Sequence, residues 1–67
     1  MTFIYRVKDH SFVTQTENRL TETVLAGLPD GLYEAIMGNM SILYQVKKCK
    51  VSMYRKPMIV RRYDLTT

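Results

Sequence analysis

Cysteine, histidine and glycine are scarce in this sequence, and tryptophan is absent. One cysteine, Cys49, cannot form an intramolecular disulfide, and a lone thiol with no secretory signal at the start favours a reducing cytoplasm. His10 and Cys49 fall short of the four ligands of a usual zinc site. A catalytic Cys–His pair would also need a third group to orient the base, and the glycines match no phosphate-binding loop. We therefore expect a protein that is not an enzyme and uses no cofactor or metal.

Long apolar runs are also missing, because no stretch approaches the roughly 18 to 20 residues that cross a bilayer. This favours a protein without a membrane segment. The hydrophobic content of 46% nevertheless argues against disorder. A chain of 67 residues makes one small domain, residues 1–67, with a thin margin of stability. Homo-oligomerisation, or docking on a larger molecule, is therefore expected.

Alternation of apolar and polar residues predicts a mainly β chain. In the first segment, TFIYRVK, Phe3 and Tyr5 alternate with Ile4 and Arg6, as they would in a strand. Gly38-Asn39 is a two-residue hairpin signal. We expect strands at residues 2–8, 12–13, 33–37, 40–46, 51–54 and 58–63. Turns are expected at residues 28–31 and 55–57, and a turn or a bulge at residues 47–48, which gives a β-meander with at most one helix.

Residues 14–27 fit two structures. Thr14 and Glu17 have the spacing of a capping box, and apolar residues recur with helical spacing after them. That pattern predicts one short helix near residues 15–27 and an α+β fold. The β-branched residues between positions 20 and 25 also suit a strand, so both structures stay open at this point.

Positive charge is concentrated near the end of the chain. Residues 1–46 hold three basic and five acidic side chains, whereas residues 47–67 hold seven basic and one acidic. Uneven charge of this kind suggests an anionic partner on one side. Apolar residues such as Val51, Met53 and Met58 alternate with the basic ones. We therefore expect the apolar residues of 47–63 to face a core, and the sheet to have one dry and one cationic face.

Two segments resemble bacterial and chloroplast translation initiation factor one. Residues 18–39, NRLTETVLAGLPDGLYEAIMGN, are similar to the opening hairpin of that family, with its Leu-Pro-Asn-(Gly/Ala) turn. Residues 62–66, RYDLT, are similar to a later segment. The resemblance implies a five-stranded OB-type barrel that binds ribosomal RNA, with residues 20–26 as a strand. The part between the two segments is shorter than in the family, and no final strand follows Thr66.

Basic residues interleaved with tyrosines suggest nucleic-acid binding, since cations follow phosphates and aromatic rings stack on bases. The leading hypothesis is a small protein that binds single-stranded or structured RNA or DNA. Its expected site residues are Lys47, Lys48, Lys50, Tyr44, Tyr54, Arg55, Lys56, Arg61 and Arg62. The alternative is a small regulatory or inhibitory protein, of the sort that phages and mobile elements encode. It would dock on an acidic surface of a larger protein.

Overall fold

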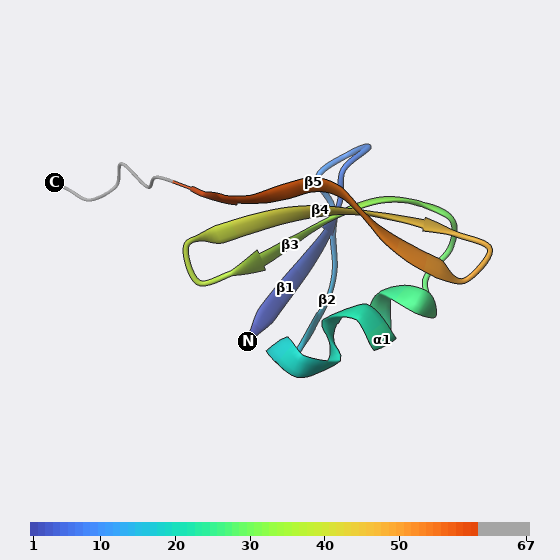
Figure 1. The fold of residues 1–67 in the computed structure, drawn as a ribbon, viewed down its shortest axis with the longest axis horizontal. Helices are drawn as coiled ribbons and strands as arrows, with labels where there is room; N and C mark the ends of the chain where they lie inside the picture. The colour runs from blue at the N-terminus through green and yellow to red at the C-terminus, as the bar shows by residue number, and fades with distance from the viewer. Residues whose placement is uncertain (61–67) are drawn as a thin grey trace, which may run out of the picture.

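The computed structural model describes residues 1–60, which form one antiparallel sheet and a short helical segment (Figure 1). The strands are β1 (Thr2–Arg6), β2 (Phe12–Thr16), β3 (Gly31–Met37), β4 (Met40–Lys47) and β5 (Lys50–Ile59). Between β2 and β3 lie the 3-10 helix η1 (Asn18–Leu20) and the α-helix α1 (Thr21–Ala26). The predicted fold class, mainly β with one short helix, is confirmed.

The sheet has the strand order β2-β1-β3-β4-β5, and neighbouring strands are antiparallel. Its edges are β2 and β5, so it is open and not a closed barrel. The Gly38-Asn39 hairpin is confirmed, because Met37 pairs with Met40 across a two-residue loop. Gly38 has a φ of 60°, the left-handed value that a primed turn demands of its first central residue.

The helix settles the two structures that residues 14–27 allow. It begins at Thr21, whereas Thr14 lies in β2, so the predicted capping box is wrong. The strand at residues 20–26 that the family resemblance implies is not formed either. Leu25 is fully buried against the sheet, and Thr21 is buried as well. Burial of the helix face that carries Thr21 and Leu25 outweighs the modest strand preference of the β-branched residues.

A short chain of hydroxyl groups ties the start of α1 to the sheet. The Thr21 hydroxyl donates to Thr2 Oγ1 at 3.0 Å, and the Thr2 hydroxyl donates to Asn18 Oδ1 at 2.8 Å. Both threonines are buried, so each needs a partner to offset the loss of water. The bonds hold the first turn of the helix against the beginning of β1.

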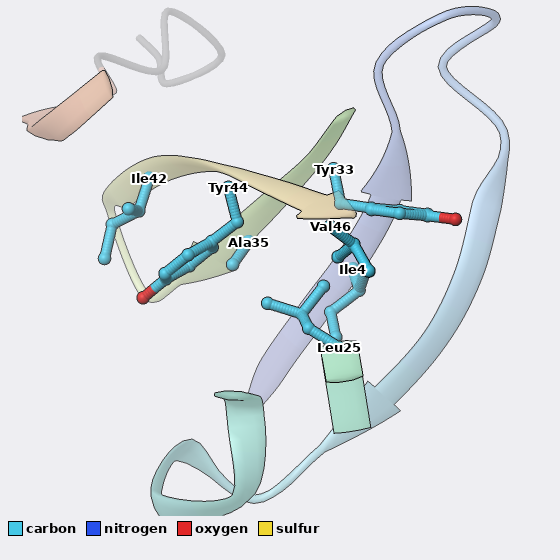
Figure 2. Packing of buried hydrophobic residues seen from close by; sticks show 7 residues of the cluster. All are labelled: Ile4, Leu25, Tyr33, Ala35, Ile42, Tyr44 and Val46. Carbon is cyan, nitrogen blue, oxygen red and sulfur yellow. The ribbon is translucent and has the colours of Figure 1, made fainter. Parts of the chain in front are cut away.

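The core lies between α1 and one face of the sheet (Figure 2). Leu25 of α1 and Ile4 of β1 are both fully buried within it. Its buried hydrophobic residues are Ile4, Leu25, Tyr33, Ala35, Ile42, Tyr44 and Val46. In β2 a register shift beside Val13 lets that side chain pack against the same cluster. The helix thus covers one face of the sheet, and no helix among residues 1–60 covers the other.

The last strand corrects two predictions. No turn forms at residues 55–57, because β5 continues from Lys50 through Pro57 to Ile59. Two register shifts against β4, near Leu43, absorb the extra residues as bulges. Proline is tolerated within this strand because β5 is an edge, where an N–H on the outer side has no partner strand. The strand predicted at residues 58–63 ends at Ile59 within the described residues, and positions 61–63 lie outside them.

Within residues 47–60, the prediction that the apolar residues of 47–63 face a core is correct only for Val51, which packs against the buried cluster. Met53, Met58 and Ile59 are exposed. A helix of six residues is too short to shield the whole of a ten-residue edge strand. The sheet therefore does not divide into one dry and one purely cationic face.

Candidate nucleic-acid interface

Three predicted site residues gather at the turn between β4 and β5, residues 47–50, called the lysine turn below. Lys47, Lys48 and Lys50 are all exposed there. Lys47 pairs directly with Lys50 across the two strands. Like charges in directly opposed positions destabilise a hairpin, so the turn keeps three cations together at a cost in stability. Such a cluster is suited to a partner with closely spaced negative charges.

The backbone of the lysine turn has an unusual conformation for its residues. Lys48 has a φ of 51° and Cys49 a φ of 66°, which is the pattern of a type I′ turn. Such positions are usually filled by asparagine or glycine, because other side chains are strained there. The Asp30 carboxylate compensates by accepting a hydrogen bond from the Lys48 N–H at 3.0 Å. The two-residue turn also explains why the apolar pattern changes phase after Val46, which pairs with Val51.

The other predicted residues are placed very differently. Tyr54 is 60% exposed at a bulge in β5, and Lys56 is exposed two residues later. Tyr44 is only 5% exposed and belongs to the core (Figure 2), so its ring is not a surface for base stacking. Sequence alternation could not separate the two tyrosines, because either face of a strand may be the buried one. Arg61 and Arg62 lie outside the described residues.

Arg55 is half-buried and hydrogen-bonded within the sheet. Its Nη2 donates to Ser41 Oγ at 2.7 Å and to the Ser41 carbonyl at 3.0 Å. The Ser41 hydroxyl in turn donates to Glu34 Oε2 at 2.5 Å. This chain links β5, β4 and β3 through a serine that is 1% exposed. Arg55 is therefore held in place by the fold, unlike the exposed lysines.

The sheet face opposite α1, called the open face below, carries aromatic rings that were not among the predicted site residues. Phe3, Tyr5 and Phe12 lie on it, because Ile4 between the first two points into the core. Phe3 is 37% and Phe12 is 54% exposed. The rings of Tyr5 and Phe12 meet edge to face, with centroids 5.6 Å apart. The alternation in TFIYRVK predicted that Phe3 and Tyr5 share one face of the strand, but it did not predict which face of the sheet the helix would cover.

A depression of about 460 Å³ lies beside the lysine turn, where the end of β1 meets the start of β3. Arg6 and Lys8 line it together with Asp30, which already holds the Lys48 N–H. The Tyr33 hydroxyl, also in the lining, donates to the Pro29 carbonyl at 2.7 Å. The polar groups of this depression thus brace the turn between α1 and β3.

His10 and Cys49 are exposed in two different loops, the first between β1 and β2 and the second in the lysine turn. Within residues 1–60, no three His, Cys, Asp or Glu side chains are grouped so that they could hold a metal ion. Neither helical segment of the described chain has the length and apolar character needed to cross a bilayer.

Comparisons with known proteins give no family. No protein-family model matches the chain, and neither the curated proteins nor the solved structures include a match. Function is therefore argued from the residues of this chain alone.

Burial of Tyr44 gives a testable pH dependence. Burial raises the pKa of the Tyr44 phenol, and the Glu22 carboxylate raises it further. The folded state then holds the phenol proton more tightly than the unfolded chain does. The resulting contribution to folding stability is complete below the ordinary pKa near 10, and it is lost as pH rises through the pKa of the folded state. We expect the urea midpoint of the wild type to fall relative to Tyr44→Phe above about pH 10. Parallel pH curves for the two proteins would contradict this.

Proposed function

We propose that this protein is a small, non-enzymatic, cytoplasmic protein that binds single-stranded or structured nucleic acid, RNA or DNA. The observation that carries the proposal is the exposure of the lysine turn together with Tyr54 and Lys56 in the same β4–β5 hairpin. Lysines supply a sequence-independent attraction to phosphates by releasing counterions. An exposed ring beside them supplies a stacking surface for a base.

The spacing of the cations supports an extended partner. Lys50 is opposite Lys47, and Arg55, the neighbour of Lys56, is opposite Leu43, so Lys50 and Lys56 are roughly 15 Å apart along the bulged strand. Lys47 and Lys48 adjoin Lys50 at one end of this line. No acidic residue occurs between positions 47 and 60. A charged polymer can contact all four lysines, whereas a small anion can meet only one end of the line.

Salt dependence tests the proposal directly. If the four described lysines each contact one phosphate of a single strand, log affinity should fall against log salt with a slope of roughly −3, since each contact contributes about −0.7. Replacing one of these lysines with glutamine should reduce the slope by up to about one. Tyr54→Ala should instead weaken binding by about 1–3 kcal/mol with an almost unchanged slope, because the ring contacts a base and not a phosphate.

The measurement is a titration of fluorescent single-stranded oligonucleotides at several salt concentrations. The matched control is Arg19→Gln, which removes one positive charge from an exposed position in η1, in a different part of the chain from the lysine turn. An equal change of slope for Arg19→Gln and Lys50→Gln would show that net charge alone explains the attraction. Binding weaker than about 100 μM at low salt, below ordinary non-specific affinity, would contradict the proposed function.

A second candidate function is docking on a larger protein, as a regulator or inhibitor of the kind encoded by phages. Exposed apolar side chains on the edge strand favour it, namely Met53, Met58 and Ile59. An edge strand can also add to the sheet of a partner. However, the two bulges and Pro57 interrupt the hydrogen-bonding edge of β5, which weakens that mode. Failure of all oligonucleotides to bind would make docking the better account.

A further inference from the structure

The open face of the sheet has continuous rows of side chains that run from one edge to the other. Directly paired residues of neighbouring strands share a face, so the register defines these rows. One row crosses all five strands: Phe12, Tyr5, Glu34, Leu43 and Arg55. A second row runs beside it: Gln15, Phe3, Ile36, Ser41 and Met58. Aromatic rings thus occupy the β1–β2 side of this face, and α1 covers the opposite face (Figure 1).

The same face ends at the lysine turn. Lys47 and Lys50 lie on it, because Val46 and Val51 beside them point toward the core. Two residues along a strand advance about 6.8 Å, so Lys47 lies two rows and roughly 13 Å along β4 from the row that contains Leu43. Cations therefore border the face at one end, while the rings lie on its far side.

The only carboxylate in the two complete rows, that of Glu34, is hydrogen-bonded within the sheet. Glu34 accepts the hydroxyl proton of Ser41, and Ser41 accepts from the Arg55 guanidinium. This chain joins one anion to one cation inside the sheet, so Glu34 presents little net repulsion to a negatively charged ligand. With that pair discounted, the charges at the lysine-turn end of the face are those of Lys47 and Lys50 and of one carboxylate, Asp30, which accepts a hydrogen bond from the Lys48 N–H. The net charge of this end is therefore positive, which is complementary to a polyanion.

We infer that the open face is the base-binding surface for a single strand of nucleic acid whose phosphates are held at the lysine turn. This inference rests on the proposed function and extends it to Phe3, Tyr5 and Phe12. A sheet without a covering layer lets splayed bases lie flat on exposed rings, which is how aromatic residues on a sheet can contact successive bases. A duplex keeps its bases stacked inside and cannot place them on these rings, so the expected ligand is a single strand.

The test is the double substitution Phe3→Leu with Phe12→Leu. Leucine keeps an apolar side chain at both positions but removes the stacking surface. We expect the affinity for a single-stranded oligonucleotide to fall by about 5- to 150-fold for each ring that stacks, with little change in the salt slope. Affinity for a duplex of the same sequence should change much less. Phe12→Tyr, which keeps a ring, should bind like the wild type.

Photocrosslinking of the wild-type protein gives a second measurement that does not depend on how the leucine variant folds. An oligonucleotide carrying 5-iodouracil should crosslink to Phe3, Tyr5 or Phe12, as identified by mass spectrometry. Crosslinks confined to Tyr54 would overturn the inference. The inference is also overturned if the leucine variant is folded and binds oligonucleotides normally while the lysine variants lose affinity. That result would leave the proposed function intact.

Three other outcomes are equally decisive. If the wild type binds no oligonucleotide, both the proposed function and the inference fail. If sedimentation shows a wild-type dimer that the leucine variant converts to monomers, while oligonucleotide binding stays unchanged, a second copy of the chain occupies the face and the inference is wrong. A protein partner lost by the leucine variant, with oligonucleotide binding retained, would overturn it in the same way.

Discussion

Leu25→Ala is expected to unfold the protein, or to leave it largely unfolded, at room temperature. Leu25 is the fully buried residue of α1 and packs with Ile4 and other core residues under the sheet (Figure 2). Truncating a buried leucine to alanine costs about 2–5 kcal/mol, from lost transfer energy and the cavity that remains. A single small core at this chain length rarely supplies more than about 3–5 kcal/mol in total. The loss is therefore comparable with the whole stability of the fold.

Circular dichroism and urea denaturation measure this effect. The control is Thr23→Ala, two residues earlier in the same helix, where the side chain is exposed. Alanine favours helix, so this control should be as stable as the wild type or slightly more stable. If Leu25→Ala and Thr23→Ala have the same urea midpoint, α1 does not form the core described here.

Reversing the charges of the lysine turn should abolish nucleic-acid binding. In Lys47→Glu/Lys48→Glu/Lys50→Glu, three attractions to phosphates become repulsions within one short turn, in which Lys47 pairs with Lys50. Single-strand affinity should fall by two orders of magnitude or more at low salt, because each lost contact also removes a counterion-release contribution. The three side chains are exposed, so the substitutions remove no core packing.

The matched control reverses Arg6, Lys8 and Arg19, which changes the net charge by the same amount. These side chains are exposed, and none lies in the lysine turn. Arg6 and Lys8 line the depression beside the lysine turn, so we expect this control to lose part of the attraction, but less than the lysine-turn variant loses. Oligonucleotide titration and thermal denaturation of both variants make the comparison. Equal loss from the two triple variants would place the attraction in net charge and not in the lysine turn.

Family resemblance and structure diverge at one point that bears on these predictions. The similarity to initiation factor one implies a strand at residues 20–26 and a closed barrel, whereas the chain has a helix from Thr21 and an open sheet. A closed barrel would turn one sheet face into an interior. In the open sheet α1 packs on the core face, and Phe3 and Phe12 lie on the opposite face, where they are exposed.

The sequence by itself determined the features that depend on local chemistry. Alternation in residues 2–8 predicted β1. Gly38-Asn39 specified the hairpin between β3 and β4, because a positive φ at the first turn position suits glycine. The gathering of lysines after Val46 was also visible, since charge needs no folding to be counted.

Only the tertiary structure decided which side of each element is buried. A strand offers two faces with equal spacing, and α1 covers one of them, so Tyr44 became core while Phe12 stayed exposed. Local preference was ambiguous at residues 20–26, and burial of Leu25 selected the helix. The sequence predicted a turn at residues 55–57, yet β5 continues through Pro57, because its position at the sheet edge removes the need for an N–H. These outcomes follow from long-range packing, which no short window of sequence contains.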